Sequence, residues 1–225
     1  MTTAQESRRA LSVVADESVG TALYLLSETS GDPVQRRRDL LTGVPDVIGY
    51  YSDGSAALAV DFYTERRDLA REVSRFTATA VIADRTVAIR RAVAWAADPL
   101  FMDDDLTARN RLAEVVQLET SRPYRDTITG NRRRDPAAVG WQRITNGGCR
   151  FCRMLAERGA IYKEATALFA SHPNCHCTAQ PVFGKDDTGE EASTIQYLAS
   201  KRSRTPAQRA KVRDYLDSVY GPDSH

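Results

Sequence analysis

All four cysteines of this 225-residue chain, and two of its three histidines, lie between positions 149 and 177. The first group is Cys-x2-Cys, at Cys149 and Cys152. The second group is His-x2-Cys-x-Cys, at His172, Cys175 and Cys177. Thiolate and imidazole groups are the ligands that Zn2+ prefers, and paired ligands on one tight turn supply two corners of a tetrahedron with little loss of chain entropy. The spacing therefore predicts a zinc site formed by two turns.

There are more candidate ligands than positions in a tetrahedral site. The expected ligands are Cys149, Cys152, His172 and Cys175, and Cys177 is the alternative to one of them. When four protein ligands surround Zn2+, no position is left for a substrate. The predicted zinc site is therefore structural rather than catalytic.

Three other interpretations of these residues stay open. Disulfides are disfavoured because no apolar secretory leader is found and the cytoplasm is reducing, although a released particle could oxidise later. Thiols without any role are disfavoured, because four cysteines are grouped so closely in the sequence. A nucleophilic pair would join Cys175 or Cys177 to His172 or His176, but the sequence offers no assignable Asp or Asn to orient the imidazole.

A zinc site of this kind needs a small scaffold, which we expect over residues 140–183. Zinc binding contributes roughly 10–16 kcal/mol to the folding of finger-like segments, enough to hold a segment with few apolar residues. Removing the metal is expected to unfold residues 140–183 and to leave the rest of the chain folded. The expected core residues are Trp141, Ile144, Phe151, Leu155, Ile161, Tyr162, Phe169, Val182 and Phe183.

The chain before the cysteines is predicted to be a helical bundle over residues 1–121, because apolar side chains recur there at helical spacing. Asp32 followed by Pro33 is a typical helix start, since the carboxylate caps free amides and proline suits the first turn. Gly43 and Pro45 are expected to end that helix. The other predicted helices cover about 10–26, 55–76, 80–97 and 105–121.

Helical spacing is lost over residues 122–139, where Pro123, Gly130 and Pro136 accumulate. This segment is predicted to be a linker, since it exceeds the usual connection of about 4–6 residues. It separates the bundle from the zinc segment.

The last part of the chain, residues 184–225, is predicted to be a polar linker followed by an amphipathic helical tail. A brief helix is expected over 190–202, and a second helix is expected to start at Thr205-Pro206. The predicted fold class is mainly α: an N-terminal helical bundle, a small α+β zinc-knuckle domain and a helical C-terminal tail.

Composition excludes several classes of protein. Lys and Arg number 31 against 30 Asp and Glu, and 42% of the residues are hydrophobic, which indicates a soluble globular chain without the strong basic charge of proteins that wrap nucleic acid. No apolar run approaches the roughly 18 residues of a membrane helix, so no membrane partner is expected. The arginine runs 36–38 and 132–134 are interpreted as solvated, with DNA or an acidic partner as the alternative for the second run.

The sequence His-Pro-Asn-Cys-His-Cys at 172–177, preceded by the Cys-x2-Cys pair, resembles the C-terminal domain of the Mu F-like minor head proteins of tailed bacteriophages, also called head morphogenesis proteins. Residues 56–63 and 140–143 resemble the form found in phages of actinobacteria, and the similarity extends over about residues 40–183. The family commonly has arginine where this chain has His176, which leaves open whether His176 also binds the metal.

This resemblance implies a low-copy minor capsid protein, made in the host cytoplasm and packaged inside the virion near the portal vertex, where it assists assembly or DNA delivery. The implied partners are the portal protein, the major capsid or scaffold proteins and packaged DNA. The implied metal ligands are Cys149, Cys152, His172, Cys175 and Cys177.

Relatives of this form are often labelled capsid maturation proteases, which makes proteolysis of head proteins the alternative function. A protease needs a nucleophile and a positioned base, and the sequence contains no nucleophile elbow and no His-Glu-x-x-His motif. Only His225 lies outside the cysteine stretch. We therefore expect a structural protein rather than an enzyme.

Overall fold

The computed structural model describes residues 2–145, 150–157, 177–184 and 205–221. Helices dominate this part of the chain, which confirms the mainly α fold class. None of the described helices has the length and apolar character needed to cross a bilayer. In chain order the elements are α1 (Ala4–Glu28), α2 (Pro33–Leu69), α3 (Thr86–Ala97), the 3-10 helix η1 (Asp98–Met102), α4 (Asp105–Arg134), β1 (Gly140–Ile144), α5 (Arg150–Glu157), β2 (Thr178–Val182) and α6 (Pro206–Tyr220).

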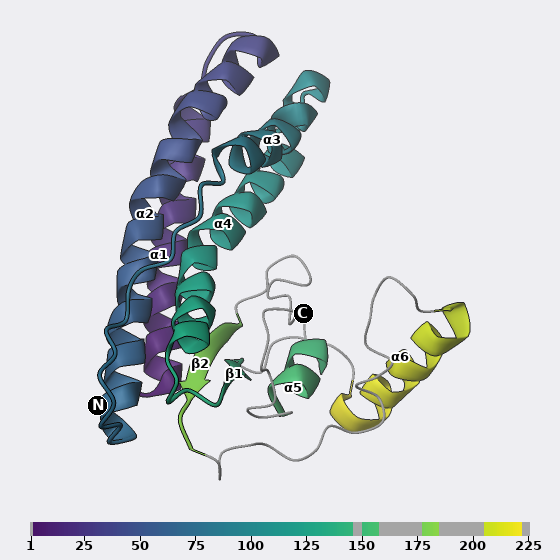
Figure 1. Cartoon of the computed structure of the whole chain (residues 1–225). Coiled ribbons are helices and arrows are strands. Elements are labelled where there is room, and N and C mark those ends of the chain that lie inside the picture. The colour runs from purple at the N-terminus through teal and green to yellow at the C-terminus, as the bar shows by residue number, and fades with distance from the viewer. Residues whose placement is uncertain (1, 146–149, 158–176, 185–204, 222–225) are drawn as a thin grey trace.

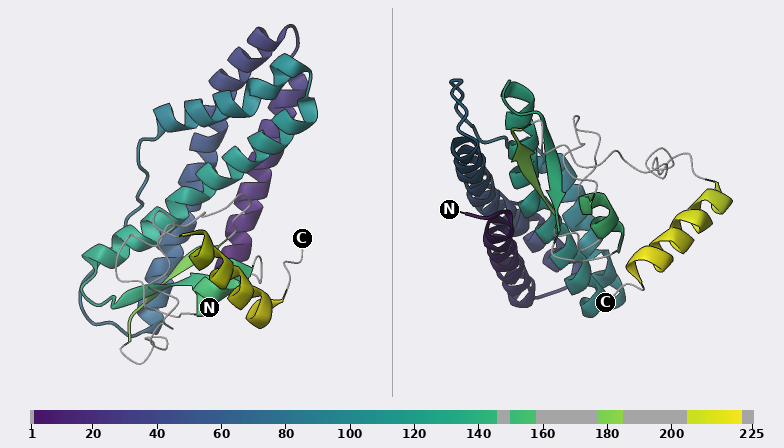
Figure 2. Two further views of the ribbon diagram at one scale, coloured as in Figure 1. Left: turned by 90° about the vertical axis from the view of Figure 1, so that its right-hand side faces the viewer. Right: turned by 90° about the horizontal axis from the view of Figure 1, so that it is seen from below.

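Three long helices, α1, α2 and α4, lie side by side and form the body of the molecule (Figure 1). The shorter α3 and η1 pack against α2 and α4 at one end of the bundle. The two-stranded sheet packs on α4 at the opposite end, near the start of α1 (Figure 2). The bundle therefore has an α3 end and a sheet end.

The first two helices begin at side-chain caps. At α1, Thr3 and Glu6 form a reciprocal capping box, in which the Glu6 amide donates to Thr3 Oγ1 at 3.1 Å. At α2, Asp32 accepts a hydrogen bond from the Gln35 amide at 2.8 Å. The helix start predicted at Asp32 is thus confirmed.

The helix break predicted at Gly43 and Pro45 is wrong, because α2 continues through both residues. Proline at position 45 has no N–H to donate to the Leu41 carbonyl, four residues earlier. Arg90 of α3 supplies the missing donor, with its Nη1 2.9 Å from the Leu41 oxygen. A side chain distant in sequence thus compensates the hydrogen bond that proline removes.

The helix predicted over 55–76 ends too late and the one predicted over 80–97 starts too early, since α2 ends at Leu69 and α3 begins at Thr86. Between the end of α2 and the start of α3, residues 70–85 form a non-helical segment, which we call the strap, that returns along the bundle (Figure 2). Arg71 adopts a left-handed φ of 55° where the strap begins. The Arg67 guanidinium donates to the Ser74 carbonyl at 2.5 Å and holds the turn in place.

Side chains of α4 bind the strap backbone. The Asn131 amide accepts from the Thr79 N–H at 2.9 Å and donates to the Thr79 carbonyl at 2.8 Å. One turn earlier, Thr127 Oγ1 accepts from the Val81 N–H at 2.9 Å. Gly130 leaves room for the strap, since a Cβ there would lie 2.9 Å from Val81 Cγ2. The extended strap is therefore held much as a strand would be, but by side chains of a helix.

The linker predicted over 122–139 is mostly helix, because α4 continues to Arg134. Pro123 is buried within α4, and the helix around it packs against α1 and α2, which outweighs the one backbone hydrogen bond that proline removes. Three arginines in the last turn of α4 also stabilise the helix, because their positive charges lie at the negative end of the helix dipole. Only residues 135–139 connect α4 to β1.

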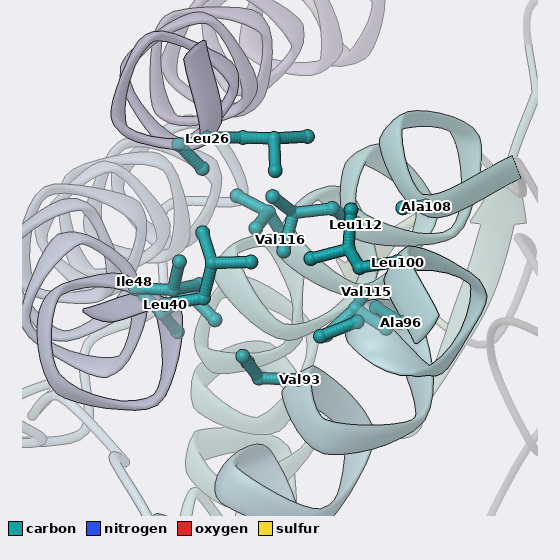
Figure 3. Close-up of a cluster of buried hydrophobic side chains, with 13 residues drawn as sticks. Leu26, Leu40, Ile48, Val93, Ala96, Leu100, Ala108, Leu112, Val115 and Val116 are labelled. Atoms are coloured by element: carbon teal, nitrogen blue, oxygen red, sulfur yellow. The ribbon is translucent and has the colours of Figure 1, made fainter. Parts of the chain in front are cut away.

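Two apolar clusters follow one another along the bundle. The aliphatic cluster lies toward the α3 end and contains only Leu, Ile, Val and Ala among its buried members (Figure 3). The aromatic cluster lies toward the sheet end and includes Tyr63, Tyr124 and Trp141. Between the two, all three long helices carry buried hydroxyl side chains, which we call the hydroxyl belt. Its members are Ser18, Ser52, Ser55, Thr120 and Ser121.

The expectation of a separate core within residues 140–183 is corrected by the position of Trp141. Its side chain is 1% exposed and belongs to the same cluster as Tyr63 and Tyr124 of the bundle. Phe183 also packs on Tyr63, with the ring centroids 5.6 Å apart. Of the expected core, Val182 is buried and Ile144 is half-buried. The side chains of Phe151, Leu155, Ile161, Tyr162 and Phe169 lie outside the described residues.

The tail helix predicted from Thr205-Pro206 is confirmed as α6. It packs against α5, and Asp217 of α6 forms an ion pair with Arg150 of α5. Leu216 is buried, whereas Val219 is exposed. The brief helix predicted over 190–202 lies outside the described residues.

Candidate metal centre

The antiparallel register of β1 and β2 determines where the cysteine groups leave the sheet. Ile144, the last residue of β1, pairs with Thr178, the first residue of β2. The chain toward the Cys-x2-Cys group follows Ile144, and the chain from the His-x2-Cys-x-Cys group precedes Thr178. Both groups are therefore attached to the same end of the ladder, although they are far apart in sequence.

Two of the five predicted ligands are among the described residues. Cys152 lies on α5 and Cys177 directly precedes β2, and each residue is 2% exposed. α5 contacts β1, so both cysteines belong to elements at the sheet end. The predicted ligands Cys149, His172 and Cys175, and the neighbouring His176, lie outside the described residues.

Arg125 of α4 fixes the position of the second cysteine group. Its side chain is 3% exposed, and its Nε donates to the Cys177 carbonyl oxygen at 3.0 Å. Arg143 of β1 is also buried, at 2% exposed, and pairs with Ala179, two residues beyond Cys177. Zn2+ bound by three thiolates carries a net negative charge, and nearby guanidinium groups favour thiolate over thiol. A buried cysteine whose backbone is bound by a guanidinium group thus fits a thiolate ligand of a zinc site.

The described residues contain no group of three or more His, Cys, Asp or Glu side chains that could hold a metal ion. Of the predicted ligands, the described residues include Cys152 and Cys177. The zinc site therefore stays a prediction. The described elements that would support it are β1, β2, α5 and Arg125.

A buried polar network positions the connection into β1. Asp135 follows α4 and accepts from Arg67 Nε at 2.9 Å and from the Tyr63 hydroxyl at 3.3 Å. Its other oxygen accepts from the Ala137 amide at 3.0 Å. Burial raises the pKa of Tyr63, and the Asp135 charge raises it further, so the hydroxyl keeps its proton and donates. The network ties α2 to the turn that leads into the sheet.

A second buried hydrogen bond joins α1 to α4 at this end. The Tyr124 and Ser7 hydroxyls lie 2.6 Å apart, and burial raises the pKa of Tyr124. Sequence reasoning missed Tyr124, Arg125 and Asp135 because all three fall in the segment predicted to be a linker. The available signal was the apolar spacing of Tyr124 and Ile128, which continues the helical pattern past Pro123.

The profile of a family described as VG15 protein matches residues 1–201 of the chain. The matched range covers the whole bundle, both strands and the complete cysteine stretch. No curated protein and no solved structure matches the chain.

Proposed function

Because the chain belongs to the VG15 protein family, a family of phage proteins, we propose that it is a minor capsid protein of a tailed bacteriophage. In this proposal it lies inside the head near the portal vertex and assists head assembly or DNA delivery. Its partners are the portal protein, the major capsid or scaffold proteins and packaged DNA.

The observation that carries this proposal is the cysteine stretch together with its scaffold. The stretch from Cys149 to Cys177 resembles that of the Mu F-like minor head proteins. The register of β1 and β2 supports a common site, since it attaches both cysteine groups to one end of the ladder. The helical bundle is a less specific feature, since many unrelated proteins have one.

Within this proposal, one structural Zn2+ joins the two cysteine groups. Cys149, Cys152, His172 and Cys175 would bind it, with Cys177 as the alternative to one of them. The ion would supply a cross-link between segments that flank the ladder, with no position for a substrate. Trp141 anchors the ladder in the bundle core. We therefore expect the ladder to stay docked when zinc is removed, which replaces the unfolding of all of residues 140–183 expected from the sequence.

The burial of both described thiols favours the structural role over a catalytic one. A cysteine nucleophile must reach the peptide bond that it attacks and therefore lies in a partly exposed position. Cys152 and Cys177 are each only 2% exposed. Burial of this kind is typical of the ligands of a closed zinc site.

Co-expression with the portal and major capsid proteins of the same phage tests the function. We expect the full chain to copurify with the portal protein and to leave the major capsid protein at its full length. Mass spectrometry of purified virions should find the chain in low copy number. Specific cleavage of the capsid protein that Cys175→Ser abolishes would contradict the proposal and favour the maturation protease, and absence of the chain from virions would also contradict it.

A further inference from the structure

A cavity of about 270 Å3 opens in the middle of the bundle, where the strap turns into α3. Pro45 of α2 and Pro123 of α4 both line it. Each proline removes one backbone hydrogen bond from a long helix, so the two helices meet here at their least regular points. None of the described residues that line the cavity belongs to the cysteine stretch, and none of the arguments for the metal site involves it.

Two polar side chains of the cavity wall have unused hydrogen-bonding capacity. Ser52 of the hydroxyl belt is only 5% exposed, and its hydroxyl makes no hydrogen bond with any described residue. Asp126 is half-buried, and its carboxylate forms neither a hydrogen bond nor an ion pair within the described part of the chain. Burial raises the pKa of Asp126, against the opposing charges of Arg122 and Arg85. Ser52 is a buried residue and Asp126 a half-buried one, so both side chains can accept hydrogen bonds from a ligand in the cavity.

The two arginines of the cavity wall already have a partner. Arg85 Nε lies 2.7 Å from a Glu119 carboxylate oxygen, and Arg122 Nε lies 3.3 Å from the same oxygen. Both guanidinium groups thus donate to Glu119, and they act on Asp126 only through space. Asp126, seven residues further along α4, has no such contact.

The charged residues that line the cavity indicate which class of ligand it would bind. Four carboxylates line the cavity against two guanidinium groups, so a cation is favoured. A compact metal ion does not fit, because the described acidic residues include no group of three that could hold one. An ammonium group carries three N–H donors, so one such group can donate to a carboxylate and to a hydroxyl at the same time.

We propose that this cavity binds a primary ammonium group, which donates hydrogen bonds to the Asp126 carboxylate and the Ser52 hydroxyl. The ammonium group comes either from a free polyamine or from a lysine side chain of a partner protein. The pairing is a charge-assisted hydrogen bond in a partly desolvated place, the kind that contributes most to binding.

Titration of the full chain with spermidine, followed by NMR and calorimetry, tests the proposal. A second titration uses a lysine-containing peptide, with the same peptide carrying alanine as its control. We expect one of these probes to shift the amide resonances around Ser52 and Asp126. Asp126→Asn should weaken that binding by about tenfold or more, because a charged hydrogen bond is lost.

Asp46→Asn is the matched control, because Asp46 is an exposed carboxylate of the same bundle that does not line the cavity. It makes the same change of charge and should leave binding within about twofold, which is the screening expected for an exposed charge. Circular dichroism checks that both variants are folded. The proposal is overturned if neither probe shifts these resonances, or if Asp126→Asn and Asp46→Asn weaken binding equally.

Discussion

The two ends of the bundle are built from different chemistry. The aliphatic cluster at the α3 end consists of leucine, isoleucine, valine and alanine side chains that interlock between helices (Figure 3). The aromatic cluster at the sheet end contains Tyr63, Tyr124 and Trp141, and buried charged groups surround it. The hydroxyl belt separates the two clusters at the same level on all three long helices.

The difference follows from what each end must bind. At the α3 end the described helices pack on other helices, whose backbone groups are mostly paired already, and Arg90 supplies the donor that the Leu41 carbonyl lacks. Apolar shape therefore does most of the packing there. At the sheet end the strap and Cys177 present backbone groups that need partners. Asn131, Arg67 and Arg125 supply them. Specific polar residues thus mark the end of the bundle that receives extended chain.

The largest expected effect comes from the two tryptophans, one at each end. Trp141→Ala removes a side chain that is 1% exposed and should lower the free energy of unfolding of the whole bundle by about 3–5 kcal/mol. Trp95→Ala removes a side chain that is 44% exposed and stacked with Arg111, and should cost less than about 1 kcal/mol. Urea unfolding followed by circular dichroism measures both. Equal losses of unfolding free energy in the two variants would contradict the proposed difference between the two ends.

Two of the ion pairs, one at each end of the bundle, give the next effect. Asp135→Asn leaves the buried Arg67 guanidinium without its counter-charge and should cost about 3 kcal/mol. Asp98→Asn breaks the exposed pair with Arg37 at the α3 end and should cost no more than about 1 kcal/mol. The same unfolding measurement applies. A small loss for Asp135→Asn would mean that the polar network does not hold the sheet end.

Two glycines of the long helices should respond with opposite signs. Gly130→Ala places a methyl group against Val81 of the strap and should destabilise the chain by about 1–3 kcal/mol. Gly54→Ala has open space around the new Cβ, so its helix propensity should stabilise the chain by about 0.5–1 kcal/mol. Thermal unfolding compares the two. Stabilisation by both variants would show that the strap does not pack on α4 as described.

The smallest effect concerns Asp126 of α4, in the middle of the bundle, whose pKa is raised by burial. As pH rises above about 4, the unfolded chain ionises at this residue before the folded chain does, so stability falls. Asp126→Asn removes that loss and should be more stable than the native chain at neutral pH, with the difference vanishing in acid. Unfolding curves across this pH range measure the effect, and a destabilised Asp126→Asn at neutral pH would contradict it.

Local signals in the sequence predicted the parts of the fold that depend on local contacts. The cap at Asp32 and the start of α6 at Pro206 require only neighbouring residues, and both predictions are confirmed. The predicted breaks at Pro45 and near Pro123 are wrong, because tertiary contacts outweigh local propensity there. Arg90, which replaces the donor that Pro45 lacks, lies 49 positions from the carbonyl it binds.

The strap was also unpredictable from local pattern. Its apolar residues, including Phe76 and Val81, have helical spacing, so residues 70–85 were divided between two predicted helices. Their conformation depends on Asn131 and Thr127, which bind the strap backbone from a distant helix. For the candidate metal site, spacing alone predicted the ligand types. The scaffold that brings the two cysteine groups to one ladder end required the register of β1 and β2.

The zinc content of the reduced, untagged full chain tests the central claim most directly. Elemental analysis should find about one zinc ion per chain, and Cys152→Ser or His172→Ala should lose it. His225→Ala, which changes the histidine outside the cysteine stretch, should retain the metal. A folded chain without stoichiometric zinc, or undiminished zinc in both Cys152→Ser and His172→Ala, would contradict the account.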